Sequence, residues 1–354
     1  MNDIYDAIVI GAGQAGLATG YHLKQAGVRF AILEAEPRPG GSWPKYYDSL
    51  TLFSPARYSG LPGFPFPGDP SRYPKRDEVV AYLRDYAARF ELPIIADARV
   101  QQVERSEPGF LLRTVKGVEY RSRTLVGASG SFYSPNVPRL PGQDRFRGTI
   151  MHSASYQNPE PFEGKRVLVV GAANSAVQIA VELAGVAKVT LATREPVRFV
   201  PQRLLGCDFH CWVRWTGLDY LPWLKDQSTP VLDPGKYKKA LAVKKPDQRR
   251  MFVGFTETGV MWPEGEEEPV DAVIFATGFR PNFPYLAGVG ALDPDGRPLH
   301  RKGVSSVVPG LYFVGMSGQR SFRSATLRGV GGDAAFIVKA LRDHLAGKAP
   351  RPCC

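Results

Sequence analysis

The residues from Tyr5 to Glu34, YDAIVIGAGQAGLATGYHLKQAGVRFAILE, decide the fold. They open with an apolar run rich in β-branched residues, which predicts a strand ending at Ile10. The turn Gly11-Ala12-Gly13-Gln14-Ala15-Gly16 follows at once. A helical pattern then runs over 17–26, and a second apolar run over 30–33 predicts another strand. The stretch is therefore expected to form a βαβ unit with a glycine-rich turn after its first strand.

The glycine turn has the spacing G-x-G-x-x-G. Gly11 permits the tight turn, Gly13 lets a pyrophosphate approach the backbone, and Gly16 lets the helix pack on the strand. The helix N-terminus supplies N–H groups and partial positive charge. Glu34 lies 21 positions after Gly13, close to the offset of about 20 residues expected for an acid that binds a ribose hydroxyl. The stretch therefore predicts a dinucleotide site.

A second unit of this kind begins at Arg166. A strand over 166–170 precedes the turn Gly171-Ala172-Ala173-Asn174-Ser175-Ala176, and a helix over 177–184 and a strand over 188–192 follow. Ala173 replaces the middle glycine, and its methyl group is expected to crowd a pyrophosphate. Arg194 stands where the first unit has Glu34. Because arginine suits a 2′-phosphate and a carboxylate suits a free 2′-hydroxyl, the first unit indicates FAD and the second NADPH.

Glu195, next to Arg194, weakens the preference for NADPH, so NADH stays possible. The alternative for Arg194 is that it is an exposed arginine in a turn that binds no phosphate.

Two βαβ units about 160 residues apart predict an α/β protein with two Rossmann-like domains. The FAD domain is expected over 1–156 and 281–354, with the nicotinamide domain inserted over 157–280. Shorter strands are expected over 125–130, 270–278 and 311–315, and a helix over 82–90. Residues 199–246 break the α/β rhythm with prolines, Trp212, Trp215 and Trp223. This aromatic excursion and the apolar segment around residue 50 are the candidate substrate pocket.

The composition is that of a soluble globular protein, with 354 residues, 44% hydrophobic and 22% charged. The chain shows no apolar run of membrane-spanning length and no signal peptide, so a cytoplasmic enzyme without a membrane partner is expected. The formal charge of +11 suits anionic partners such as dinucleotide phosphates. The lysines and arginines between residues 236 and 250 have little aromatic content among them, so no nucleic-acid partner is expected.

The four cysteines are too few for a disulfide framework in a chain of this size. Cys207 and Cys211 flank His210, but a structural zinc needs four ligands, and Cys353 and Cys354 lie at the chain end. No metal site is expected. The chain has no C-x-x-C pair, which disfavours a flavin disulfide reductase.

The segment FRGTIMHSASY, residues 146–156, has the pattern F-x-G-x-x-x-H-x-x-x-Y between the two glycine turns. With it occur Gly40-Gly41-Ser42-Trp43, Phe64-Pro65-Phe66-Pro67, Asn174-Ser175 and Ala276-Thr277-Gly278-Phe279-Arg280-Pro281. In these motifs, and over essentially its whole length, the chain resembles the flavin-containing monooxygenases and their Baeyer–Villiger relatives, above all the shorter bacterial members.

The resemblance implies roles for individual residues. FAD would be held by Gly11, Gly13, Gly16, Glu34, Ser42 and Trp43, and NADPH by Asn174, Ser175 and Arg194. Further cofactor-binding positions are expected at Gln14, Gly41, Val100, Gly130, Gly171, Thr277, Gly278 and Gly315. His152 and Tyr156 are expected to belong to the linker between the domains rather than to act as acid–base catalysts.

One position departs from the family. Many members place an asparagine against the flavin shortly before the F-P-F-P segment, and the corresponding residue here is Phe53. Ser54 is the nearest polar neighbour. Phe53 and Ser54 are therefore the candidate catalytic positions at the flavin face.

The function implied is that of an FAD-dependent monooxygenase. NADPH would reduce the flavin, O2 would give a C4a-hydroperoxide, and one oxygen would pass to a small sulfide, amine or ketone. One alternative is an NADPH:flavin reductase or oxidase that produces only hydrogen peroxide, which is compatible with Phe53. Another is a non-enzymatic redox sensor, which would need only one good dinucleotide site. A homodimer is possible.

Overall fold

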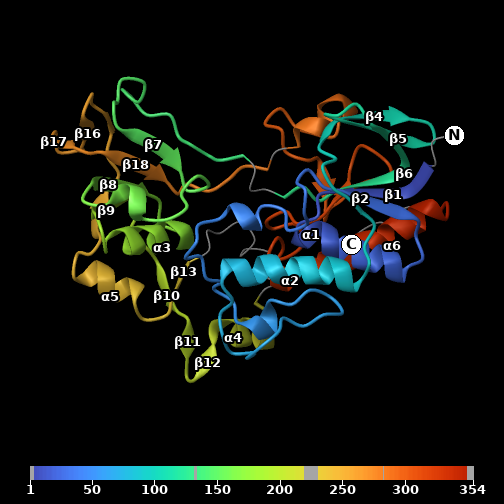
Figure 1. Ribbon diagram of the computed structural model, residues 1–354, viewed down its shortest axis with the longest axis horizontal. Helices are drawn as coiled ribbons and strands as arrows, with labels where there is room; N and C mark the ends of the chain where they lie inside the picture. The colour runs from blue at the N-terminus through green and yellow to red at the C-terminus, as the bar shows by residue number, and fades with distance from the viewer. Residues whose placement is uncertain (1–3, 131–133, 219–229, 282, 349–354) are drawn as a thin grey trace.

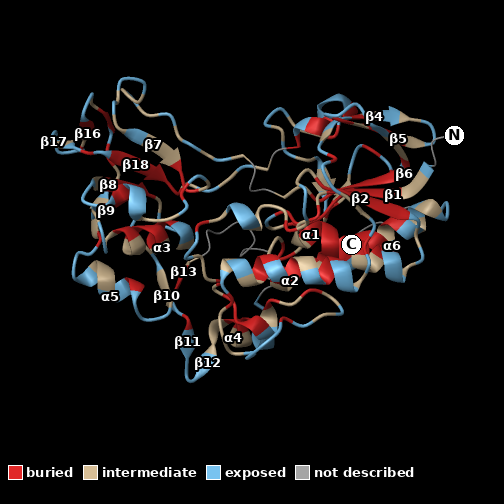
Figure 2. Ribbon diagram, viewed as in Figure 1, coloured by how far each residue is buried: buried red, intermediate tan, exposed pale blue. Residues whose placement is uncertain are grey.

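The computed structural model describes residues 4–130, 134–218, 230–281 and 283–348. Within these ranges the chain forms two large sheets, each with helices packed on one face, that lie side by side in Figure 1, and three smaller sheets. The sheet strands form the buried centre of each half (Figure 2).

The first sheet has a parallel core in the order β21-β6-β1-β2-β3. Its strands are β1 (Ile4–Ile10), β2 (Phe30–Leu33), β3 (Ile94–Ile95), β6 (Glu119–Gly127) and β21 (Leu311–Phe313). Beyond β21 lie β20 (Val304–Ser305) and β19 (His300–Arg301), and β6 also pairs with the hairpin of β5 (Gly109–Thr114) and β4 (Val100–Ser106).

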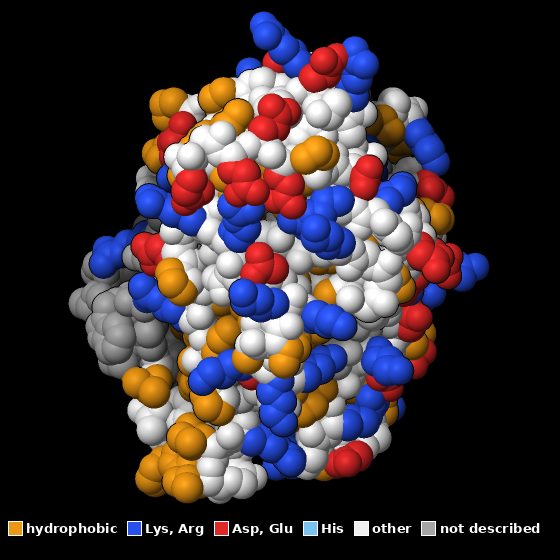
Figure 3. All heavy atoms as spheres, turned by 90° about the vertical axis from the view of Figure 1, so that its left-hand side faces the viewer, with side chains coloured by type: hydrophobic (Ala, Val, Ile, Leu, Met, Phe, Trp, Pro, Cys, Tyr) orange, Lys and Arg blue, Asp and Glu red, His pale blue; other side chains and the backbone are white. Residues whose placement is uncertain are grey.

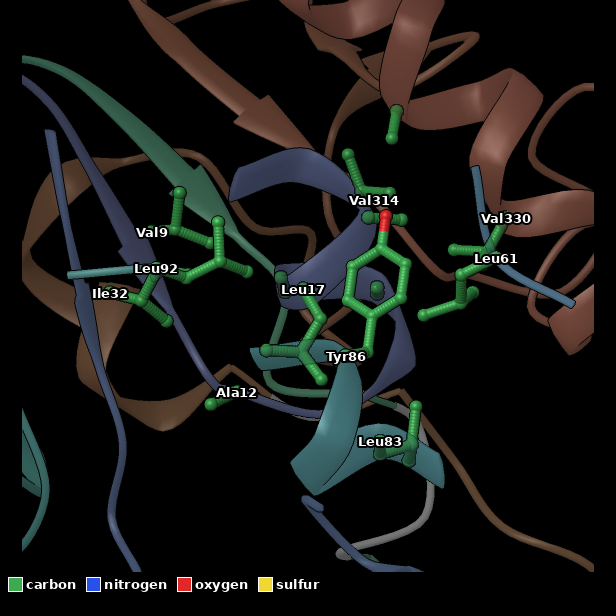
Figure 4. Packing of buried hydrophobic residues seen from close by; sticks show 14 of the residues in the cluster. Val9, Ala12, Leu17, Ile32, Leu61, Leu83, Tyr86, Leu92, Val314 and Val330 are labelled. Carbon is green, nitrogen blue, oxygen red and sulfur yellow. The ribbon is translucent and has the colours of Figure 1, made fainter. Parts of the chain in front are cut away.

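Side chains that alternate along β1 fill two cores on opposite faces of this sheet. Ala7 and Val9 pack with α1 (Gln14–Gln25), α2 (Arg76–Arg89) and α6 (Leu327–Leu345). Figure 4 shows Leu17 and Tyr86 at the centre of this helical side. Ile8 and Ile10 pack on the other face against the β4–β5 hairpin and the 3-10 helix η6 (Pro284–Val289). Among the described residues, further short 3-10 turns are η1 (Trp43–Lys45), η2 (Ala56–Tyr58) and η3 (Glu160–Phe162).

The second sheet is parallel throughout, in the order β14-β9-β8-β18-β7. Its strands are β7 (Thr149–His152), β8 (Arg166–Val170), β9 (Lys188–Thr193), β14 (Asp247–Arg250) and β18 (Ala272–Phe275). One face is covered by α3 (Asn174–Leu183) and α5 (Tyr237–Ala242). The other face packs on a small antiparallel sheet of β15 (Gly254–Phe255), β16 (Gly259–Met261) and β17 (Glu267–Pro269).

The expected helices begin earlier in the structure than the apolar periodicity indicates. The helix expected over 17–26 is α1, Gln14–Gln25, and that expected over 177–184 is α3, Asn174–Leu183. The helix expected over 82–90 is α2, Arg76–Arg89. In each case the first turn carries small or polar residues, which the hydrophobic pattern does not detect.

The chain passes between the sheets twice, and the two passages run alongside each other. Asn136 N donates to Gly278 O, and Arg280 N donates to Ser134 O, both at 2.9 Å. β7 pairs with β18, so residues 149–152 belong to the second sheet. The domain boundary expected at residue 156 would assign β7 to the first domain, whereas in the structure β7 belongs to the second sheet. The sequence placed the boundary later because β7 is short and follows a long irregular stretch.

The aromatic excursion leaves the second sheet after β9. It contains β10 (Phe199–Pro201), β11 (Arg203–Leu204), β12 (Cys207–Asp208), α4 (Phe209–Thr216) and β13 (Val231–Asp233). β10 pairs with β13 beside α3, and the β11–β12 hairpin and α4 extend to the lower edge of Figure 1. Trp223 lies outside the described residues.

Basic side chains are spread over the face that Figure 3 shows, with acidic ones among them in its upper part. Within the described ranges, none of the helices has the length and apolar character that crossing a membrane requires.

Candidate active site

A cavity of about 650 Å³ lies between the two sheets and is lined by residues of both domains. Its volume lies within the range of about 300–1,000 Å³ typical of ligand sites. The first sheet contributes the ends of β1 and β2, and the second contributes the start of α3. Both glycine turns therefore contribute residues to the lining of one space.

The glycines of the first turn are required by close backbone packing. A Cβ on Gly16 would stand 1.7 Å from Gly11 O, so only glycine lets α1 pack on the turn. Gly11 has φ +104°, in the region that favours glycine. Gly41, at φ +57°, brings its backbone against Gly13, where a Cβ on Gly41 would stand 2.8 Å from Gly13 Cα. These contacts form a cradle of bare backbone at the cavity wall.

The helices after both turns begin without a side-chain cap. Gly13 caps α1, Ala173 caps α3, and neither helix has an acidic residue in its first turn. The free N–H groups and the partial positive charge of each helix are therefore available to an anion. Two such helix ends at one cavity fit the phosphates of two dinucleotides.

Glu34 is buried at the end of β2, with 2% of its surface exposed. Its Oε2 accepts from Ala12 N at 2.6 Å, and its Oε1 accepts from Glu36 N at 3.0 Å. The carboxylate is therefore fixed between the glycine turn and the strand end, and it lines the cavity. This is the place where an acceptor for ribose hydroxyls is needed.

The second turn keeps the glycine its backbone requires. Gly171 has φ +140°, and a Cβ there would stand 2.5 Å from Ala276 O. Ala173 has φ −98°, which alanine adopts without strain, just as Gly13 has φ −78°. Any effect of the Ala173 methyl group therefore concerns the approach of a ligand and not the backbone conformation.

Arg194 follows β9 and is exposed, outside the cavity lining. Glu195 pairs with Arg198, with Nη2 and Oε2 3.4 Å apart. Its carboxylate is thus turned to another partner. Arg250 ends the adjacent strand β14, where it pairs in register with Thr193. A second arginine therefore lies at this strand edge, which the sequence did not reveal because β14 and β9 are far apart in the chain.

The cavity brings together most of the predicted site residues. Those that line it are Gly11, Gly13, Gln14, Glu34, Gly41, Ser42, Trp43, Phe53, Ser54, Val100, Gly130, Asn174, Ser175 and Gly315. Those that do not line it are Gly16, Gly171, Arg194, Thr277 and Gly278. Gly16 and Gly171 act in packing, and Thr277 and Gly278 bond to the other passage between the sheets at Asn136.

Several cavity residues escaped the sequence reasoning because their partners are distant in the chain. Tyr47 Oη donates to Gln178 Oε1 at 2.6 Å and so joins the first domain to α3. Burial raises the pKa of Tyr47, so it stays a neutral donor. Ser129 and Tyr285 share a hydrogen bond of 2.9 Å between their hydroxyl groups. All four side chains line the cavity.

Gln14 fixes two further parts of the wall. Its Oε1 accepts from Trp43 Nε1 at 3.1 Å, and its Nε2 donates to Ala325 O. Ala325 lines the cavity together with Thr326 and with Leu327, the first residue of α6.

The two candidate flavin-face residues differ in what they offer. Phe53 lines the cavity and carries no polar side-chain atom. Ser54 is buried, and its hydroxyl lies 3.0 Å from the Ser59 hydroxyl. The serine is therefore engaged within its own loop.

His152 is the last residue of β7 in the second sheet, and Tyr156 follows it in the same domain rather than in a linker. His152 Nδ1 accepts from Ala154 N, so the proton is on Nε2, which donates to Gly278 O at 2.9 Å. Burial lowers the pKa of His152. Tyr156 is buried and donates to Glu182 at 2.8 Å. The His152 side chain therefore joins β7 to Gly278, and the Tyr156 side chain joins its own segment to α3.

The described cysteines and the described tryptophans of the excursion lie away from the cavity lining. Cys207 is exposed in β12 rather than in a helix, and Cys211 lies in α4. Trp212 does not line the cavity, and Trp215 is 80% exposed. Among the described residues no group of three or more potential metal ligands occurs. Cys353 and Cys354 lie outside the described residues.

Two βαβ units with uncapped helix ends at one shared cavity define an oxidoreductase that pairs a flavin with a nicotinamide cofactor. The model of the pyridine nucleotide-disulphide oxidoreductase family matches residues 8–315. The flavin-containing monooxygenase of Stenotrophomonas maltophilia superimposes with a TM-score of 0.86 at 32% identity, covering 98% of this chain and 99% of the other.

Among curated proteins, an uncharacterized CzcO-like oxidoreductase of Geobacillus kaustophilus is 36% identical over 97% of this chain and 100% of its own. The indole-3-pyruvate monooxygenase YUCCA4 of rice is 32% identical over 97% of this chain and 88% of its own. The chain belongs to the pyridine nucleotide-disulphide oxidoreductase family and, within it, groups with the flavin-containing monooxygenases. The resemblance read from the motifs, the two-domain α/β fold and the enzyme class are confirmed.

Proposed function

We propose that the protein uses FAD and NADPH to transfer one atom of O2 to a small sulfide, amine or ketone. The observation that carries the proposal is the shared cavity, because residues from both glycine-turn units line a single space. FAD would lie along the first turn, with its ribose at Glu34 and its pyrophosphate at the start of α1. The nicotinamide cofactor would lie at the start of α3, near Asn174 and Ser175.

The cofactors supply the redox chemistry, in which the reduced flavin activates O2. The chain's own residues bind, orient and exclude water. Tyr47 and Gln178 hold the two domains together at the cavity, and Leu50, Leu52 and Phe53 give it an apolar wall. A wall of this kind favours small apolar substrates and limits access of water to the reacting atoms.

The preference for NADPH over NADH rests on Arg194, with Arg250 at the same strand edge. An arginine binds a 2′-phosphate through charge-assisted hydrogen bonds. The pairing of Glu195 with Arg198 supports this assignment, since it engages the acid that would oppose a phosphate.

A second function is an NADPH oxidase that releases hydrogen peroxide. Phe53 favours it, because a phenyl ring offers no hydrogen bond to activated oxygen. Two arguments oppose the other rivals. A flavin disulfide reductase would need a cysteine beside the flavin for thiol–disulfide exchange, and no described cysteine lines the cavity. A redox sensor would not need two dinucleotide sites at one cavity.

The test is NADPH oxidation by the FAD-loaded protein under ¹⁸O2 with a panel of substrates. The panel contains an aryl alkyl sulfide, a tertiary amine, a cyclic ketone and indole-3-pyruvate, the last chosen because of the rice relative. The proposal expects one ¹⁸O atom in the product of at least one substrate, and more product than peroxide for it. Peroxide alone with every substrate would favour the oxidase.

A further inference from the structure

The aromatic excursion of the second domain contacts the loop of the first domain that carries Phe53. Figure 1 shows β11, β12 and α4 in the lowest part of the molecule, below the level of α2. Three side chains of the excursion, Gln202, Asp208 and His210, are directed at the first domain. Neither the glycine turns nor the linker requires these contacts.

Gln202 holds the backbone of Phe53. Its Nε2 donates to Phe53 O at 3.1 Å across 149 residues, and Gln202 itself is only 6% exposed. The neighbouring anchors of the loop stay within the first domain, since Leu52 N donates to Pro74 O and Ala56 N to Arg72 O. The carbonyl of Phe53 is thus bonded by the other domain.

Gln202 is itself fixed from the second glycine turn. Asn174 Oδ1 accepts from Leu232 N at 3.2 Å, β13 pairs with β10, and Gln202 N donates to Asp233 O at 3.0 Å. A continuous series of hydrogen bonds therefore joins the start of α3 to the wall of the cavity.

His210 holds the ring of Phe53. The two rings are stacked, with centroids 6.0 Å apart and planes at 17°. His210 is 3% exposed, and its Nδ1 lies 2.8 Å from Asp208 Oδ1, which also accepts from His210 N at 2.8 Å. The carboxylate therefore fixes both the backbone and the ring of His210.

Asp208 also bonds to the first domain, because Tyr73 Oη donates to its Oδ2 at 2.5 Å. Burial alone would raise the pKa of Asp208, but the hydrogen bonds from His210 and Tyr73 outweigh burial and lower it. An ionised carboxylate between a phenol and an imidazole makes charge-assisted hydrogen bonds, which are stronger than neutral ones.

We propose that Tyr73, Gln202, Asp208 and His210 form a clamp that positions Phe53 at the cavity. These are positioning residues, since they act on the cavity wall through Phe53. By this clamp the second domain sets how closely the wall covers the cofactor, and so how much activated oxygen is lost as hydrogen peroxide. The positioning of Phe53 is inferred from the contacts alone. The effect on the loss of activated oxygen as hydrogen peroxide rests on the proposed function.

The first experiment is hydrogen exchange followed by mass spectrometry on the FAD-loaded protein. Gln202→Met keeps the length of the side chain and removes the donor, and His210→Ala removes the ring. Gln202→Met should exchange about 2- to 12-fold faster in the peptide around Phe53, the range expected for loss of one hydrogen bond. His210→Ala should also exchange faster there, because it removes the stacked ring. Peptides from β8 and β18 should be unchanged. Trp215→Ala, on the same helix but 80% exposed, is the control and should leave the Phe53 peptide unchanged.

The second experiment measures the share of NADPH recovered as hydrogen peroxide. That share should rise in Gln202→Met and His210→Ala, while the rate of flavin reduction by NADPH stays within about twofold. His210→Phe, which keeps a ring for stacking, should restore most of the loss. If His210 served only to stabilise the fold, replacing it by another aromatic ring would not restore the lower share of hydrogen peroxide.

Unchanged exchange around Phe53 in both variants would overturn the clamp. A wild type that forms no oxygenated product would instead refute the proposed function. The exchange experiment would still decide the clamp in that case, because it does not depend on turnover.

Discussion

Phe53 and Arg194 are the residues at which this chain departs most informatively from a generic two-cofactor flavoprotein. Phe53 lies in the cavity lining, and its neighbours His210 and Gln202 are known only from the structure. Arg194 was predicted from its offset from the glycine turn. Its neighbour Arg250 could not be, because strand pairing between β9 and β14 leaves no mark in either segment.

Arg194→Ala should raise the Michaelis constant for NADPH by about 10- to 100-fold and that for NADH much less. A charge-assisted contact to phosphate contributes about 1.5–3 kcal/mol. Initial rates with both nicotinamides measure this, with Arg301→Ala as the control, since Arg301 is also exposed but lies in the first sheet. Equal effects of Arg194→Ala on both cofactors would show that Arg194 does not read the 2′-phosphate.

The wild type should lose a sizeable share of its NADPH to hydrogen peroxide, and Phe53→Asn should lower that share. An amide can hydrogen-bond activated oxygen, whereas a phenyl ring cannot. The measurement is product and peroxide per NADPH oxidised in both proteins. Product formed nearly one for one with NADPH in the wild type would show that an apolar wall protects the oxygen sufficiently.

At the scale of elements, the sequence predicted both βαβ units because each carries its signal within about 30 contiguous residues. Glycine spacing, apolar strands and the terminal acid or arginine all lie in one stretch. It failed where a signal needs distant partners, as with β7, whose place in the second sheet follows from its pairing with β18. The helix starts were also missed, because Gln14 and Asn174 are polar and adjoin the turns.

The second and third glycines of the first turn, Gly13 and Gly16, should respond differently to substitution by alanine. Gly16→Ala should destabilise the apoprotein by about 1–3 kcal/mol, because its Cβ would meet Gly11 O at 1.7 Å. Gly13→Ala should leave the stability of the apoprotein nearly unchanged, since the nearest atom to an added Cβ is 3.5 Å away and the φ of Gly13 is −78°. It should weaken FAD binding, because the methyl group occupies the approach to the pyrophosphate.

Urea unfolding of the apoproteins and FAD titration of each variant separate the two effects. FAD binding that Gly13→Ala leaves unaltered would show that the pyrophosphate does not approach this turn.

At the scale of the whole molecule, stability should fall as the solution is acidified from about pH 7.5 to about pH 5.5. Burial lowers the pKa of His22, His152, His300 and His344 in the folded state. The unfolded chain, with histidine pKa values of about 6.5, then takes up protons before the folded one. The stabilisation these groups provide is therefore present above about pH 6.5 and is lost as the pH falls below it.

His152→Gln tests one contribution, because it removes the titrating group that joins β7 to Gly278. The difference in unfolding free energy between the two pH values should be smaller in this variant than in the wild type. A wild-type stability that rises on acidification would contradict the assignment.

The proposed function requires that one cavity brings a flavin and a nicotinamide cofactor together. The most direct measurement is the flavin absorbance of the FAD-loaded protein after one equivalent of NADPH is added without oxygen. The account predicts that the yellow absorbance is bleached and returns when O2 is admitted. Flavin that stays oxidised with NADPH and NADH, in protein whose flavin dithionite reduces, would contradict it.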